Sequence, residues 1–198
     1  MSDLLQYDVF LIEWLHANGH NGFLDWLMPM WRNKLFWIPL YILIAVHLFW
    51  KFQKKGFWII ALALLTIGLA DTCSSKVIKP WVQRARPCQS AEVLPKIHPL
   101  VTCGSGYSFP SSHATNHFAL AMFLGLTLTF GHKTCWLFWG LILWAASISF
   151  GQVYVGLHYP TDILAGALLG SLLGWLVYLI RHILERRFLP QLSKKSQV

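Results

Sequence analysis

Three short stretches, far apart in the sequence, combine residue types that bind phosphate or transfer protons. The first runs from Lys79 to Pro87, the second from Pro110 to His113, and the third from His158 to Asp162. Together they supply cations, small hydroxyl groups, two histidines and a carboxylate, a set of groups that suits covalent phosphoryl transfer without a metal. The rest of the chain is nearly all apolar, so the polar groups are concentrated where these stretches lie.

In the third stretch, His158 and Asp162 are four residues apart and flank Pro160 at an expected helix start. A carboxylate at this spacing can accept a hydrogen bond from one imidazole nitrogen, which fixes the tautomer and leaves the other nitrogen free to attack. The alternative is an aspartate that only favours the helix dipole, next to an unrelated histidine. Because an ionisable pair at membrane depth is costly unless it is used, the pattern favours a functional pair.

The second stretch predicts the start of a helix, with Ser111 or Ser112 as the N-cap. His113 then lies in the first turn, where unpaired backbone N–H groups can bind an anion. We predict that His113 is a general acid. An ordinary capped helix that carries a surface histidine is the alternative.

The first stretch places Lys79, Arg84 and Arg86 just beyond an apolar run. Arginine gives paired donors to phosphate oxygens, and lysine gives a point charge. The alternative is an anchor for lipid headgroups. Pro80 and Pro87 fix the backbone between the cations, which fits a shaped site better than a flexible anchor.

The composition indicates an integral membrane protein. The mean hydropathy is +0.50, only 12% of the residues are charged, and the chain holds eleven Trp and thirteen Phe. A formal net charge of +8 would suggest a nucleic-acid ligand in a soluble protein. Here the cations lie at the ends of apolar runs, so membrane topology and a phosphorylated ligand explain them better, and we expect no nucleic-acid partner. The N-terminus lacks a basic region, so we expect no cleaved signal peptide.

We predict an all-α bundle of five to six transmembrane helices with an N-terminal interfacial helix over residues 4–16. Residues 23–31 are the possible sixth element, half-inserted. Residues 1–188 are expected to form a single integral membrane domain, and residues 189–198 a disordered cytoplasmic tail. Five stronger apolar runs approach the length that crosses a membrane: 35–50, 57–75, 113–131, 135–155 and 163–180.

The positions of Lys and Arg predict the topology of the bundle. The 51–55 loop, the 131–134 loop and the C-terminus carry a modest excess of these residues, which places them in the cytoplasm. All three polar stretches then lie on the outer face, two of them at helix N-termini. An inverted orientation is the alternative.

Taken together, the three stretches resemble the type 2 phosphatidic acid phosphatase family, which shares its core with the vanadium haloperoxidases. That family has the pattern Lys-x6-Arg-Pro, then Pro-Ser-Gly-His, then Ser-Arg-x5-His-x3-Asp. The resemblance covers roughly residues 60–180. The matching residues are Lys79, Arg86, Pro87, Pro110, Ser111, His113, His158 and Asp162, with Ser112 where glycine is usual.

The resemblance implies a mechanism. His158 would attack phosphorus and form a phosphohistidine, Asp162 would orient it, and His113 would protonate the leaving oxygen and then activate water. No cofactor and no metal are expected, in line with the lack of a ligand spacing of the usual metal kinds. The equatorial oxygens would be neutralised by backbone N–H groups together with Lys79, Arg86, Ser111 and Ser112.

One departure from the family pattern concerns the phosphate. Gly151 and Gln152 stand where the family has Ser-Arg. Gln152 can donate hydrogen bonds but carries no charge, and this would weaken phosphate binding or rate by about one to two powers of ten. We expect Arg84 to compensate in part, so that Arg84→Ala would impair activity nearly as much as Arg86→Ala. An inactive or substrate-shifted member is the alternative.

Cys88 and Cys103 both lie in the 76–112 loop on the proposed outer face. A disulfide between them would hold the segment with Arg86 against the segment that leads into Ser111. Two free thiols are the alternative.

We predict a membrane-embedded lipid phosphatase in a bacterial inner membrane that removes a terminal phosphate at the outer face. The expected substrates are undecaprenyl pyrophosphate, phosphatidic acid or phosphatidylglycerol phosphate, and membrane lipids are the expected partners. A lipid A phosphatase or phosphotransferase is a second hypothesis, and a catalytically weak lipid-phosphate binder is a third. The oligomeric state stays open, although Gly166, Gly170 and Gly174 are expected to pack within the bundle rather than in a dimer.

Overall fold

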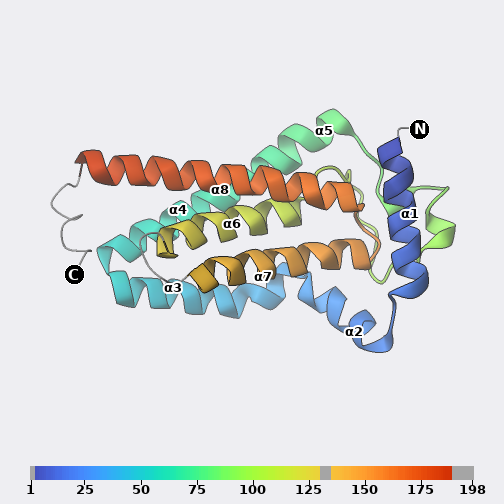
Figure 1. Cartoon of the computed structure of the whole chain (residues 1–198), viewed down its shortest axis with the longest axis horizontal. Coiled ribbons are helices and arrows are strands. Elements are labelled where there is room, and N and C mark those ends of the chain that lie inside the picture. The colour runs from blue at the N-terminus through green and yellow to red at the C-terminus, as the bar shows by residue number, and fades with distance from the viewer. Residues whose placement is uncertain (1–2, 130–134, 189–198) are drawn as a thin grey trace.

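The computed structural model describes residues 3–129 and 135–188, and this part of the chain is built of helices and contains no strand. The predicted all-α membrane bundle is thereby confirmed. Its long helices run side by side (Figure 1). They are α3 (Ile38–Phe52), α4 (Lys54–Asp71), α6 (Ser112–Thr129), α7 (Cys135–Tyr154) and α8 (Pro160–Phe188).

Helix α1 (Asp3–Asn18) lies crosswise over one end of the bundle, and α2 (Gly22–Trp31) follows it at the same end (Figure 1). The inner face of α1 is buried and carries a residue every fourth position: Asp8, Ile12 and His16. Its outer face is apolar and exposed, as expected of an interfacial helix. The outer residues are Leu4, Tyr7, Phe10, Leu11 and Trp14.

The number of candidate membrane-spanning segments is close to the predicted five to six but does not equal it. Within the described residues, four segments are long and apolar enough to span a membrane: Lys34–Phe52, Lys54–Gln89, Cys135–Tyr154 and Pro160–Glu185. The predicted run 113–131 forms α6, which packs against α4, α7 and α8 at the centre of the bundle. Its first turns carry His113, Asn116 and His117, and these polar residues lower its hydropathy. The predicted 131–134 loop and the 189–198 tail lie outside the described residues.

The 54–111 segment leads from the membrane core to the end that α1 covers. Helix α4 continues through a π-helical stretch, η2 (Thr72–Ile78), and a short helix, α5 (Lys79–Val82), which ends at Gln83 in the left-handed conformation with φ 53°. Two 3₁₀ turns follow, η3 (Pro87–Gln89) and η4 (Leu94–Lys96). A disulfide joins Cys88 to Cys103, whose Cα atoms are 6.0 Å apart. It ties together the two ends of the irregular segment between α5 and α6.

Helix α8 packs directly on the backbone of α6. A Cβ atom at Gly166, Gly170 or Gly174 would lie 2.7, 2.2 or 2.3 Å from a backbone oxygen of α6 or of the residue before it. Only glycine permits such an approach. The three glycines therefore pack within the bundle, as expected.

Candidate active site

His158 and Asp162 lie in the turn between α7 and α8 and in the first turn of α8. Gly156 makes this turn possible, because its φ of 79° falls in the left-handed region. Nδ1 of His158 is 3.4 Å from Oδ2 of Asp162, and the two side chains are only 2% and 0% exposed. Since a carboxylate accepts hydrogen bonds, Nδ1 carries the proton and Nε2 has a lone pair. The backbone N–H of Tyr159 also donates to Oδ2, at 2.9 Å, which holds the carboxylate in place.

Arg86 faces the other nitrogen of His158. Its Nη1 lies 3.3 Å from Nε2 of His158, and its Nε donates to the backbone oxygen of Gly106 at 2.8 Å. Lys79 is buried and donates from Nζ to the backbone oxygen of Tyr107 at 2.6 Å. Lys79 and Arg86, two of the three cations of the first stretch, are thus anchored on the same loop, and Arg86 lies next to the histidine of the third stretch.

The two serines of the second motif lie at the start of α6. Ser111 is fully buried, and its Oγ accepts a hydrogen bond from the backbone N–H of Ala114 at 3.4 Å, as a helix cap does. Its own backbone N–H donates to the backbone oxygen of Asp162 at 3.0 Å, which ties the second motif to the third. Oγ of Ser112 accepts from Oγ of Ser74 at 3.1 Å.

His113 is half-buried in the first turn of α6, and its ring lies parallel to that of His117, with the ring centres 6.4 Å apart. The ring of His117 is held by contacts within the bundle. Its Nδ1 is 2.8 Å from the backbone oxygen of His113, its Nε2 is 3.1 Å from the hydroxyl of Tyr41, and its ring packs edge-on against Trp144. Of the two histidines on α6, His113 is the one nearer to the start of the helix and to Ser111.

Gln152 is fully buried near the end of α7. Its backbone oxygen accepts hydrogen bonds from the N–H groups of Leu157 and His158, at 3.1 and 3.2 Å, and so shapes the turn that carries His158. Its side-chain Oε1 accepts from Nε of Arg32 at 3.1 Å. Arg32 follows α2 and was not among the residues predicted for the site.

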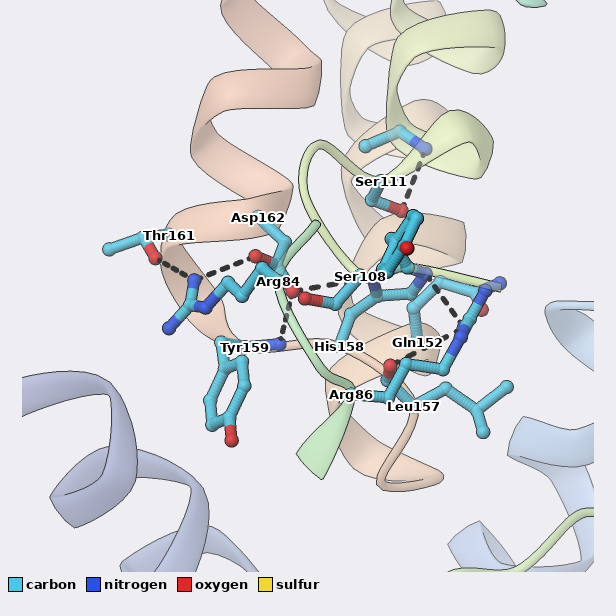
Figure 2. Close-up of polar contacts among 12 residues, drawn as sticks. Arg84, Arg86, Ser108, Ser111, Gln152, Leu157, His158, Tyr159, Thr161 and Asp162 are labelled. Carbon is cyan, nitrogen blue, oxygen red and sulfur yellow. Dashed lines mark hydrogen bonds and ion pairs between the residues drawn. The ribbon is translucent and has the colours of Figure 1, made fainter. Parts of the chain in front are cut away.

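Arg84 has a different place from the one expected. Its Nη1 donates to Oδ1 of Asp162 at 2.7 Å, its Nη2 donates to Oδ2 of Asp8 at 2.7 Å, and its guanidinium lies 4.0 Å from the ring centre of Tyr159. Figure 2 shows Arg84 and Arg86 on opposite sides of the His158–Asp162 pair. Because the charge of Arg84 is shared between two carboxylates, its position favours a role in holding Asp162 over the expected compensation for the arginine that position 152 lacks.

Asp8, the other partner of Arg84, is like Arg32 a residue that was not predicted for the site. It is 1% exposed, and its Oδ1 accepts a hydrogen bond from the backbone N–H of Thr161 at 2.9 Å. The carboxylate of Asp8 within the largely apolar α1 could have indicated a partner for it elsewhere in the site, since a buried charge requires one. The contact joins α1 to the first turn of α8.

The structure therefore places the three motifs at the end of the bundle that α1 and α2 cover (Figure 1), and Figure 2 shows Arg86, Ser111 and Asp162 around His158. A histidine with one nitrogen held by a carboxylate and the other beside a guanidinium can attack an electrophile that carries negative charge. The surrounding lysine, serines and amide are donors suited to the oxygens of a phosphate group.

Comparison with known proteins agrees with this chemistry. The profile of the PAP2 superfamily matches residues 56–186, which hold all three motifs. The chain belongs to the PAP2 superfamily. This confirms the resemblance that the motifs indicated.

Named relatives of this PAP2 protein are membrane phosphatases. It is 37% identical to a lipid A 4'-phosphatase from Bacteroides thetaiotaomicron over 178 residues, which cover 87% of this chain and 77% of the relative. It is 35% identical to phosphatidylglycerophosphatase B from Bacillus subtilis over 149 residues, 72% of this chain and 66% of the relative. The crystal structure of a transmembrane PAP2 type phosphatidylglycerolphosphate phosphatase from B. subtilis superposes with a TM-score of 0.76 at 25% identity, covering 95% of this chain and 90% of that one. The PAP2 protein is thus a phosphate-ester hydrolase of a bacterial membrane.

The protonation of His158 in this PAP2 protein can be tested directly. Burial lowers the pKa of His158 from its usual 6.5 to about 4, Asp162 opposes this shift, and Arg86 adds to it. A lowered pKa means that the imidazole is neutral at pH 7, as a nucleophile must be. We expect ¹⁵N-histidine NMR of the detergent-solubilised protein to give a titration midpoint near 4 for His158, assigned with the His158→Gln variant. A midpoint near 6.5 would contradict the buried, neutral state.

Proposed function

We propose that this PAP2 protein removes a phosphate group from a membrane lipid through a phosphohistidine at His158. The observation that carries the proposal is the placement of His158, with Nδ1 held by Asp162 and Nε2 beside Arg86. This arrangement directs the lone pair of Nε2 towards the place where a guanidinium would hold a phosphate. A catalytically weak binder of lipid phosphates would not need the His158–Asp162 pair.

The proposed reaction has two steps. In the first, Nε2 of His158 forms a bond to phosphorus while the bond from phosphorus to the lipid oxygen breaks, and His113 gives that oxygen a proton. In the second, His113 takes a proton from water, whose oxygen attacks phosphorus and releases phosphate and His158. Asp162 stabilises the positive imidazole between the steps. The donors for the phosphate oxygens are Lys79, Arg86, Ser111, Ser112 and the amide of Gln152.

Apolar surface at the same end of the bundle supports a lipid substrate. The exposed apolar face of α1 lies close to the site, which α1 reaches through Asp8. Helix α2 adds Phe23 and Trp26, which are 66% and 63% exposed. Such a surface can lie among acyl chains and headgroups while the phosphate reaches the cations behind it.

Two substrate classes are candidates. One comprises undecaprenyl pyrophosphate, phosphatidic acid and phosphatidylglycerol phosphate, whose phosphate is linked to a flexible lipid. The other is lipid A, and the 37% identity to the lipid A 4'-phosphatase over 87% of this chain favours it. The same site chemistry serves both, because each substrate presents a terminal phosphate.

The proposal includes a location in the membrane. Residues 1–188 would form one phosphatase domain in the inner membrane, with the site on the outer face. The junction between α3 and α4, where Lys51 lies in the last turn of one helix and Lys54 and Lys55 begin the next, lies at the end of the bundle away from α1 (Figure 1). Since basic connections favour the cytoplasmic side, this position supports the proposed outer location of the motif residues.

A substrate panel tests the proposal. Purified protein is given lipid A, phosphatidic acid, phosphatidylglycerol phosphate and undecaprenyl pyrophosphate in matched micelles, and released phosphate is measured. We expect one class to be preferred by at least about tenfold in kcat/KM, which is the effect of about 1.4 kcal/mol of binding. No release from any substrate would refute the function.

The proposed outer orientation has its own test. Intact spheroplasts should hydrolyse a membrane-impermeant aryl phosphate, and hydrolysis only after lysis would show that the site faces the cytoplasm.

A further inference from the structure

The two positions at which the third motif departs from the family pattern both face Arg32. Gly151 stands where the pattern has serine, and a Cβ atom there would lie 3.3 Å from Cβ of Arg32 and 3.8 Å from the backbone oxygen of Met28. Because 3.3 Å is tighter than ordinary carbon contact, glycine lets the end of α2 lie against α7 here. Gln152 stands where the pattern has arginine and accepts a hydrogen bond from Nε of Arg32.

Arg32 brings a second guanidinium near Arg86 without a counter-charge. Burial, and then the charge of Arg86, lower the pKa of Arg32, but an arginine keeps its proton in proteins. Within residues 3–129 and 135–188, no carboxylate pairs with Arg32, and its terminal nitrogens make no hydrogen bond. Two like charges in a half-buried place repel each other, and an oxyanion bound between them removes that repulsion.

Gln152 adds a donor at the same place. It is fully buried, and its Nε2 has no hydrogen-bond partner in the described part of the chain. An amide N–H group left in this state is costly, which points to a ligand that accepts from it. The two ends of the amide thus have different tasks: Oε1 holds Arg32, and Nε2 stays available.

We propose that Arg32 gives the phosphate group the guanidinium that position 152 lacks, and that Gln152 positions it. This inference rests on the proposed phosphatase function. It assigns a phosphate-binding role to the residue that follows α2, which lies outside the residues that the PAP2 profile matches. Nη1 of Arg86 is 3.3 Å from Nε2 of His158, and Arg32 is bonded to Gln152, whose backbone oxygen accepts from the N–H of His158, so both arginines lie beside the turn that carries His158. Compared with the family pattern, one positive charge is then supplied by the residue after α2 instead of by position 152 on α7, and the net charge of the site is unchanged.

The test restores the family arginine in a chain that lacks Arg32. Wild type, Arg32→Ala, Arg32→Gln and the double variant Arg32→Ala/Gln152→Arg are compared by two measurements. One is the Kd of inorganic phosphate from calorimetry, and the other is kcat/KM for a soluble aryl phosphate. We expect each single variant to weaken both by about ten- to a hundredfold, as loss of a hydrogen bond to a charged group does. The double variant should recover most of this loss.

Lys34→Ala is the matched control, because Lys34 is an exposed cation on the same connection between α2 and α3, and it should leave both values unchanged. Arg32→Gln keeps a side chain that can bond to Gln152, so it provides the answer if the alanine variant does not fold. Wild-type values in Arg32→Gln, or no recovery in the double variant, would overturn the inference. If the wild-type chain itself neither binds nor releases phosphate, the proposed function fails instead.

Discussion

Replacement of His158 by alanine is expected to reduce phosphate release by roughly 10⁴-fold or more, since removal of a covalent nucleophile has effects of this size in other hydrolases. The imidazole is buried, Nδ1 is held by Asp162, and Nε2 is open towards Arg86. Without it, the cations can still bind phosphate, but no group in their midst can form the covalent intermediate. A phosphate-release assay on the preferred lipid measures the effect.

A trapping experiment separates loss of the nucleophile from loss of the fold. Phosphohistidine survives in alkali, so rapid mixing with ³²P-labelled substrate and an alkaline quench should leave label on the wild-type chain and none on His158→Ala. His47→Ala removes an exposed histidine of α3 and serves as the control with normal labelling. Full activity in His158→Ala would eliminate the covalent scheme.

Replacement of Arg84 by alanine should have the second-largest effect, on stability as well as activity. Arg84 bridges Asp8 and Asp162, which are 1% and 0% exposed, at 2.7 Å each. Its removal leaves two buried carboxylates without their cation, and breaking such a pair costs about 3–5 kcal/mol. Activity should fall because Asp162 is then free to turn away from His158. Thermal unfolding in detergent and the phosphate-release assay measure the two effects.

The role of Arg84 can be separated from phosphate binding. In the Arg84→Ala background, Asp8→Asn removes one of the unpaired charges and should restore part of the melting temperature. Lys96→Ala is the matched control, because Lys96 also joins the 83–111 segment to α1, through Glu13 at 2.9 Å, but on the exposed surface, where little change is expected. An Arg84→Ala variant with normal stability and weakened phosphate binding would return Arg84 to the role that its sequence position suggested.

The site residues that could be predicted are those whose relation follows from their spacing within one short stretch of the sequence. His158 and Asp162 are separated by one helical turn, and Ser111 caps the helix on which His113 lies, so spacing alone indicates their relation. The apolar runs likewise predicted the helices, because a chain segment in lipid must satisfy its own backbone. Helix α6 departs from that rule in composition, since it is shielded by its neighbours and carries polar residues of the site.

The remaining site residues are brought together by tertiary contacts between segments far apart in the sequence. Asp8 meets Arg84 across 76 residues, and Arg32 meets Gln152 across 120, so no spacing in the sequence relates them. Arg84 is two residues from Arg86, and this proximity favoured a shared role. The backbone between them sends the two guanidinium groups to opposite sides of the His158–Asp162 pair, where they have different partners. Charge alone could not distinguish a ligand for phosphate from a partner for a carboxylate.

The glycine contacts between α6 and α8 have a consequence for turnover. His113 stands on α6 and Asp162 on α8, and the two helices touch backbone to backbone at Gly166, Gly170 and Gly174. We expect a pair packed in this way to move as one rigid unit, so that His113 and Asp162, which holds Nδ1 of His158, keep a constant separation through the proposed cycle. We then expect the motion that admits a lipid and releases its product to come from the other elements beside the site, α1 and the 83–111 segment.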